Sequence, residues 1–192
     1  MNLPNKLSLL RIFLIPVMIF FYLADFVPYG KIIAIGVFII AAFTDFLDGK
    51  IARKYNLVTN LGKLLDPIAD KLLVISALLL VVIDNTIIHP YGVIIAIIII
   101  GRELLISAFR QIAASQNVVM AADMFGKVKT FTQDIALPIL FLLSFLTYNI
   151  VANETFVLVV KIVAYVGIGL ATLFTVLSGA NYIIKNKHVL KG

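Results

Sequence analysis

The sequence predicts an all-α integral membrane protein with six transmembrane helices. Hydrophobic residues make up 62% of the 192-residue chain, and only 14% of its residues are charged. The mean hydropathy is +1.09, and apolar stretches long enough to cross a bilayer recur along the whole chain. Soluble domains carry about a quarter charged residues, whereas a membrane span takes about 20 mostly apolar ones. Residues 1–192 are therefore expected to form a single membrane domain.

A short polar segment opens the chain, and six apolar stretches follow it. Residues 2–6 are expected to lie at the membrane interface, ahead of the first span. Turn-forming residues separate the stretches, and in chain order they are Pro28-Tyr29-Gly30, Tyr55-Asn56, Asp84-Asn85, His89-Pro90, Gln116-Asn117 and the run from Asn149 to Asn153. These breaks place the spans at about 7–26, 31–54, 62–83, 91–115, 127–148 and 155–184.

The charges orient these spans. The formal net charge is +6, and one set of span ends holds Lys6, Arg11, Lys50, Arg53, Lys54, Lys63, Arg110, Lys127, Lys129, Lys185, Lys187 and Lys191. Cytoplasmic loops are rich in Lys and Arg, so both termini are expected in the cytoplasm, beside anionic lipid headgroups. The cations are spread along the chain, so nucleic acid is not expected as a partner. With no cysteine and two histidines, disulfides and a His/Cys zinc site are excluded.

Four aspartates fall inside the second and third spans, where a charge is costly and most often functional. Asp45 and Asp48 are three residues apart, and Asp66 and Asp70 are four apart, so each pair shares a helix face. The short connection makes the two spans antiparallel neighbours, and counting outward from it places the pairs level. Four converging carboxylates repel one another unless cations join them, and Mg²⁺ or Mn²⁺ would do so. A carboxylate network neutralised by Arg53 and nearby lysines is the alternative.

The aspartates belong to a longer pattern. The chain reads Asp45-x-x-Asp48-Gly49-x-x-Ala52-Arg53, then eight residues, then Gly62-x-x-x-Asp66-x-x-x-Asp70. At every fixed position this resembles the signature of the CDP-alcohol phosphatidyltransferases, D-x2-D-G-x2-A-R-x8-G-x3-D-x3-D. The resemblance implies a six-helix membrane fold and an enzyme that passes the phosphatidyl group of CDP-diacylglycerol to an alcohol and releases CMP.

The same resemblance assigns roles to individual residues. It implies that Asp45, Asp48 and Asp66 bind two divalent ions, and that Asp70 is the general base and also touches the second ion. It further implies a homodimer. It also suggests which residues bind CDP-diacylglycerol, namely Gly49, Ala52, Arg53, Thr59 and Gly62. Without it, Gly49 and Ala52 would indicate close helix packing, and Arg53 an interfacial charge that extends toward water.

The prediction of the acceptor alcohol depends on shorter motifs. The opening run with Asn5, Ser8 and Arg11, the triplet Gly101-Arg102-Glu103 and the segment from Gly126 to Gln133 resemble the bacterial branch of the family that makes phosphatidylglycerophosphate. This implies sn-glycerol 3-phosphate as acceptor, in a bacterial cell membrane with the active site facing the cytoplasm. Asn5, Ser8 and Arg11 would then line the pocket near the lipid diphosphate. The acceptor phosphate would be held by Arg110, Lys127, Lys129 and Arg102.

Other interpretations stay open at this point. The nearest alternative is the same reaction with inositol phosphate or another polar alcohol as the acceptor. Lys127 and Lys129 would suit membrane anchoring on composition alone, and Arg102 and Glu103 would suit mutual neutralisation. A transporter would also place acidic residues in spans, but the sequence has no inverted repeat and its acidic cluster lies toward one side. A purely structural scaffold leaves the level aspartates unexplained.

Overall fold

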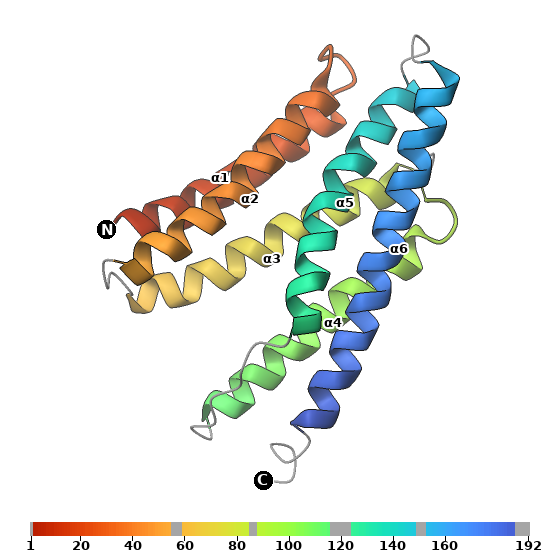
Figure 1. The fold of residues 1–192 in the computed structure, drawn as a ribbon. Helices are drawn as coiled ribbons and strands as arrows, with labels where there is room; N and C mark the ends of the chain where they lie inside the picture. The colour runs from red at the N-terminus through yellow and green to blue at the C-terminus, as the bar shows by residue number, and fades with distance from the viewer. Residues whose placement is uncertain (1, 55–58, 85–87, 116–123, 149–152, 187–192) are drawn as a thin grey trace.

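The computed structural model describes residues 2–54, 59–84, 88–115, 124–148 and 153–186, and every regular element in these ranges is a helix. The helices, in chain order, are α1 (Leu3–Leu23), α2 (Gly30–Lys54), α3 (Asn60–Ile83), α4 (Gly92–Ser115), α5 (Met124–Tyr148) and α6 (Glu154–Lys185). The predicted all-α membrane architecture is therefore confirmed for the described part of the chain. Figure 1 shows α1 and α2 side by side, α3 passing from them toward α4, and α5 paired with α6.

Side-chain caps define where several helices begin. Asn2 caps α1 by accepting a hydrogen bond from the backbone N–H of Asn5, and Thr59 caps α3 by accepting one from Gly62. Asn153 caps α6 through the N–H of Thr155. Short polar side chains at this position satisfy N–H groups that lack a partner within the helix. Local sequence therefore sets these boundaries before any packing is considered.

The N-terminal segment differs from the expectation in one respect. Residues 2–6 are not a separate element, because α1 runs without a break from Leu3, with a proline in its first turn. Proline suits that position since its missing N–H needs no partner there. Asn5, Ser8 and Arg11 recur every three residues and are all buried. The polar face of this turn is therefore directed at neighbouring helices, and its depth in the membrane stays a prediction.

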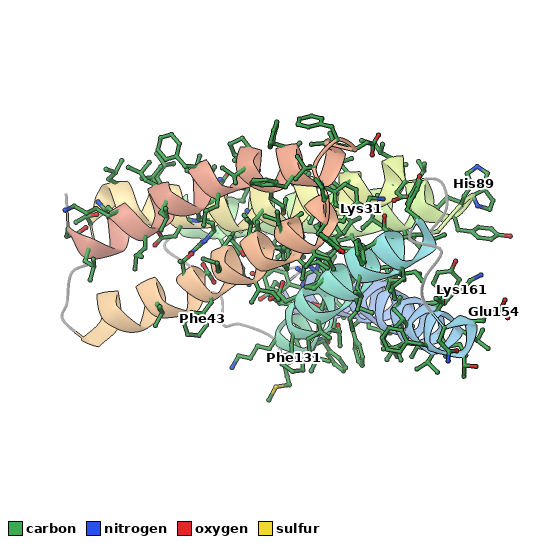
Figure 2. All side chains as sticks on the ribbon, turned by 90° about the horizontal axis from the view of Figure 1, so that it is seen from above. Lys31, Phe43, His89, Phe131, Glu154 and Lys161 are labelled. Carbon is green, nitrogen blue, oxygen red and sulfur yellow. The ribbon has the colours of Figure 1, made fainter. Side chains whose placement is uncertain are left out.

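Four of the helices are long and apolar enough to cross a membrane. Within the described residues these segments are Asn5–Leu23, Gly92–Ala113, Met124–Tyr148 and Glu154–Lys185. Large apolar side chains on outward surfaces, such as Phe43 and Phe131, are exposed and project away from the helices in Figure 2, as expected when the solvent is lipid. The helices α2 and α3 carry the four aspartates, and the count of six crossings stays a prediction.

The main hydrophobic core draws on all six helices. Phe141 of α5 is its centre, with ring centroids 4.6 Å from Tyr22 and 6.3 Å from Phe38. Fully buried alanines, including Ala34 and Ala77, let the helix backbones approach closely. A smaller cluster, which includes Phe109 and Tyr182, joins α4 to α6.

Candidate active site

One face of α1 carries three polar side chains that reach the signature residues of α2 and α3. Arg11 donates from Nη1 to Oδ1 of Asp45 at 2.8 Å, and Ser8 donates from Oγ to Asp66. Oγ1 of Thr59 donates to Oδ1 of Asn5 at 3.0 Å. The three residues predicted to contact the donor lipid are therefore bound to, or beside, the acidic signature. The spacing of three residues makes this possible, since such positions share a helix face.

Burial differs sharply within the Arg11–Asp45 pair. The Arg11 side chain is 0% exposed, whereas that of Asp45 is 47% exposed. Nε of Arg11 also donates to the backbone carbonyl of Ala41 at 3.3 Å. Two hydrogen bonds to α2 thus fix the guanidinium. The side of the Asp45 carboxylate that does not contact Arg11 is accessible. A carboxylate oriented in this way is suited to bind a further cation.

Gly62 lies in a position where a larger residue would not fit. A Cβ atom there would come within 2.8 Å of Oδ1 of Asn5 and 3.3 Å of Oγ1 of Thr59. Its N–H donates to the same Thr59 hydroxyl. The glycine of the signature therefore lets the start of α3 approach α1 closely, which brings Asp66 within reach of Ser8.

The structure describes the side chains of three of the four signature aspartates, Asp45, Asp66 and Asp70. Asp45 and Asp70 lie close enough for their carboxylates to repel each other, and Arg11 attracts Asp70. Among the described residues, no group of three or more acidic or histidine side chains is arranged to hold a metal ion. The backbones of four further signature residues belong to α2, but what surrounds these residues lies outside the described part of the structure; they are Asp48, Gly49, Ala52 and Arg53. The oxygen donors of Asp45, Asp66 and Asp70 are of the kind that Mg²⁺ and Mn²⁺ prefer.

A pocket of about 770 Å³ opens beside Asp70, between α3, α4, α5 and α6. Three of the four residues predicted to hold the acceptor phosphate line it together with Asp70, namely Arg102, Arg110 and Lys127. Its other polar lining residues are Lys71, Glu103, Ser107, Gln111, Thr130, Asp134 and Tyr182. Guanidinium and ammonium groups gathered in one hollow fit a phosphate. Asp70 therefore stands between the acidic signature and a cationic pocket.

Lys129, the fourth predicted phosphate residue, occupies a different place. It is 3% exposed, and its Nζ lies 2.5 Å from Oε1 of Glu103. The same oxygen accepts from Nη1 of Arg102 at 3.1 Å. Lys129 lines a small inner cavity beside the pocket. Glu103 thus pairs with both Lys129 and Arg102, and Lys129 lies in the inner wall and not among the residues that line the pocket.

Two residues of α6 bond the arginines of the cationic pocket and were not predicted. Nη2 of Arg102 donates to Oγ of Ser178. Nε of Arg110 donates to the hydroxyl of Tyr182 at 3.3 Å, and the guanidinium lies 5.6 Å from the centre of that ring. Both contacts join residues more than 70 positions apart. A serine and a tyrosine in an apolar helix carry no local signal of such a role.

The arrangement suits a reaction between two phosphate-bearing molecules. The acidic signature could hold metal ions and, through them, a diphosphate. The cationic pocket could hold a second, anionic substrate. Asp70 borders both regions and could accept a proton there.

Comparisons with known proteins agree with this geometry. Residues 1–177 match the family model described as CDP-alcohol phosphatidyltransferase. A Bacillus subtilis (strain 168) protein named CDP-diacylglycerol–glycerol-3-phosphate 3-phosphatidyltransferase is 41% identical, over 99% of this chain and 97% of that protein. A protein of the same name from Rickettsia bellii (strain RML369-C) is 37% identical, over 94% and 93%. A rice protein named cardiolipin synthase (CMP-forming) is 41% identical, over 73% of this chain and 45% of that protein.

Proposed function

This chain belongs to the CDP-alcohol phosphatidyltransferase family, and from that premise we propose that it transfers the phosphatidyl group of CDP-diacylglycerol to sn-glycerol 3-phosphate. The products are phosphatidylglycerophosphate and CMP. The two bacterial relatives that align over nearly their whole length are named for these two substrates. The observation that carries the proposal is the position of Asp70, which borders a pocket lined by Arg102, Arg110 and Lys127.

The donor lipid binds on the side of α1 and the signature. Arg11 and Ser8 orient Asp45 and Asp66, while Asn5, Thr59 and Gly62 hold the start of α3 against α1. Gly49, Ala52 and Arg53 belong to the same site by their positions in the signature. Small residues let a nucleotide approach the helix, and the arginine suits its phosphates.

Divalent-metal dependence is general to this family. In this chain Asp45, Asp48, Asp66 and Asp70 would hold the metal, as two ions of Mg²⁺ or Mn²⁺. Bound ions supply a clamp for the diphosphate and neutralise charge on the departing phosphate. Ser8 and Arg11 contribute by fixing two of these carboxylates in place, as residues behind metal ligands commonly do.

The acceptor binds with its phosphate at Arg110, Lys127 and Arg102, while Lys129 holds Glu103 in place beside Arg102 from the inner wall. Asp70 takes the proton of the free primary hydroxyl. The hydroxyl oxygen forms a bond to the phosphorus that carries diacylglycerol, and the bond from this phosphorus to the bridging oxygen breaks. CMP leaves with that electron pair, so charge and atoms balance.

The cellular setting follows from charge and hydropathy. The chain is a membrane protein, and we place it in a bacterial cell membrane with several crossings, both termini and the active site on the cytoplasmic side. Glycerol 3-phosphate is water-soluble and enters the pocket from that side. The protein acts as a homodimer in this proposal, with membrane lipid around its apolar faces.

The acceptor has a second candidate. The rice relative is named for cardiolipin synthesis, so a lipid acceptor is the first alternative, followed by inositol phosphate or another polar alcohol. Cations facing an open pocket favour a small phosphorylated acceptor over a neutral alcohol.

Purified protein with labelled CDP-diacylglycerol and a panel of acceptors tests the proposal. We expect CMP release with glycerol 3-phosphate, and little with phosphatidylglycerol, inositol phosphate or serine. Release with another acceptor but none with glycerol 3-phosphate would overturn the choice of acceptor. Absence of CMP release with every acceptor, together with ion flux in liposomes, would favour a transporter.

A further inference from the structure

A small inner cavity lies next to the acceptor pocket, between α3, α4 and α5. Its volume is about 30 Å³, and it shares five lining residues with the pocket, Asp70, Lys71, Glu103, Thr130 and Asp134. A space of about 10–15 Å³ on this measure admits one water molecule. The cavity therefore has room for a hydroxyl group or one or two waters. Asp70, the proposed base, is in its wall.

Gln133 of α5 also lines this cavity and has an unusual environment. Its side chain is almost completely buried, with the residue 1% exposed. Neither Oε1 nor Nε2 has a hydrogen-bond partner among the described residues. A buried amide without partners is costly and uncommon in native proteins. Such a group indicates that a polar ligand completes its bonding.

The neighbours of Gln133 narrow the choice of ligand. Lys129, one turn earlier on α5, is paired with Glu103 at 2.5 Å, so the cation at the inner end is already neutralised. The cavity wall holds three carboxyl groups, those of Asp70, Glu103 and Asp134, and two ammonium groups, those of Lys71 and Lys129. Because the carboxyl groups outnumber the ammonium groups, an anion has no advantage here over a neutral hydroxyl, which can hydrogen-bond the amide. A hydroxyl donates one hydrogen bond and accepts others, so it can bond either atom of an amide.

Glycerol 3-phosphate carries two hydroxyls, and the proposed reaction uses the primary one at Asp70. The secondary hydroxyl is on the adjacent carbon, between the reacting end and the phosphate. We propose that Gln133 hydrogen-bonds this secondary hydroxyl and so selects a glycerol-based acceptor. The inference rests on the proposed function and adds to it the residue that recognises the part of the acceptor that does not react.

The test compares two acceptors of equal charge. One is sn-glycerol 3-phosphate, and the other is 3-hydroxypropyl phosphate, which keeps the phosphate and the primary hydroxyl but lacks the secondary hydroxyl. The ratio of their kcat/KM values is measured for the wild type and for Gln133→Met, which has a similar shape without the amide. A site that bonds a substrate hydroxyl discriminates against the analogue without it. We expect the wild type to prefer glycerol 3-phosphate by roughly ten-fold or more, and Gln133→Met to prefer it by less than about three-fold.

Thr147→Val is the matched control, because it removes a hydroxyl from the same helix about 21 Å farther along. Among the described residues the Thr147 hydroxyl bonds the carbonyl of Leu143 in its own helix and no other group, so the ratio should stay at the wild-type value. Thermal unfolding without substrate gives a second measurement. Gln133→Met should unfold at or above the wild-type temperature, since an unsatisfied amide is removed. A lower temperature would indicate that the amide is satisfied by resident water and would overturn the inference.

The outcomes separate the two proposals. Turnover with glycerol 3-phosphate but an unchanged ratio in Gln133→Met would overturn the role of Gln133 and leave the proposed function intact. Equal use of both acceptors by the wild type would also overturn the role of Gln133 and leave the proposed function intact. No wild-type turnover with glycerol 3-phosphate would overturn the proposed function itself. If Gln133→Met is too slow to measure, Gln133→Asn, with its amide drawn back by one methylene, should reduce the ratio part of the way, and an unchanged ratio would count against the inference.

Discussion

Arg11 and Asp45 form an ion pair that joins α1 to α2, with Nη1 2.8 Å from Oδ1, and only the carboxylate is accessible. The guanidinium supports one side of Asp45 and leaves the other side for a ligand. We predict that Arg11→Met lowers turnover by about 10- to 100-fold and raises the Mg²⁺ or Mn²⁺ concentration needed for half-maximal activity, as losses behind metal ligands commonly do. CMP release measured across a metal titration gives both quantities.

Arg11→Lys is the informative companion to this variant. It keeps the positive charge but cannot reproduce the bonds from Nη1 to Asp45 and from Nε to the carbonyl of Ala41. Turnover should therefore fall between the wild type and Arg11→Met. If Arg11→Met shows wild-type turnover and an unaltered metal requirement, Arg11 does not orient Asp45.

The helices were largely predictable from apolar length, because a bilayer demands a minimum span. The structure begins α2 at Gly30 and ends α3 at Ile83, within a residue of the predicted limits of 31 and 83. The first turn of α1 was harder, since Asn5 fell in the predicted interfacial segment 2–6 and Ser8 near the start of a span predicted from apolar residues alone. Their burial depends on partners in α3, which a local pattern does not reveal.

The site was predictable only where its residues form a spaced motif. The aspartates of α2 and α3 stand at fixed intervals near one turn, so helix geometry alone suggested that they meet. Ser178 and Tyr182 bond the pocket residues Arg102 and Arg110 through the packing of α6 on α4, across more than 70 residues. Gln133 was noticed only as part of a motif, because whether an amide finds a partner is a property of the folded interior.

Asp70 is the residue on which turnover should depend most directly. Asp70→Asn keeps the size of the side chain but can no longer take up a proton. We predict that turnover falls by about 10² to 10⁴, the usual range for loss of a general base, while binding of CDP-diacylglycerol changes by less than about three-fold. Turnover is followed by CMP release, and binding by equilibrium retention of labelled donor.

Asp25→Asn provides the control for this measurement, because Asp25 is exposed beyond the end of α1. It should leave both turnover and donor binding at wild-type values. Asp70→Asn with near wild-type turnover would refute the assignment of Asp70 as the base. Lost donor binding would instead show that Asp70 acts mainly in holding the donor.

Tyr182 should position the acceptor without taking part in the chemistry. Its hydroxyl accepts from Nε of Arg110, and its ring lies beneath the guanidinium. Tyr182→Phe removes the hydrogen bond and keeps the ring. We predict that KM for glycerol 3-phosphate rises by about 3- to 10-fold with kcat within about two-fold, since one hydrogen bond of ordinary strength is lost.

Tyr165→Phe on the same helix is the matched control for Tyr182, about 26 Å away along the axis. It should leave KM for the acceptor unchanged. A fall in kcat with constant KM in Tyr182→Phe would contradict a positioning role. Steady-state kinetics at saturating CDP-diacylglycerol distinguish the two outcomes.

A second polar cluster, formed by Tyr22, Lys31, Asp84 and Ser144, joins four helices far from the signature. Oδ2 of Asp84 accepts from Nζ of Lys31 at 3.0 Å and from the hydroxyls of Tyr22 and Ser144. Asp84 is 14 residues beyond Asp70, or about 21 Å along α3. We therefore predict a role in stability alone.

Asp84→Leu leaves Lys31 without its carboxylate, and breaking a buried ion pair costs about 3–5 kcal/mol. For a chain of this size that corresponds to a fall of roughly 6–20 °C in unfolding temperature. Lys31→Met should cause a loss of similar size. The double variant Lys31→Met/Asp84→Leu should regain much of it, because apolar replacement of a whole buried pair is often neutral.

Thermal unfolding in detergent measures the stability of all three variants, and KM for both substrates should stay unchanged in the folded fraction. Additive losses in the double variant would show that the two residues do not act as a pair, and a changed KM would show that the cluster influences the distant site.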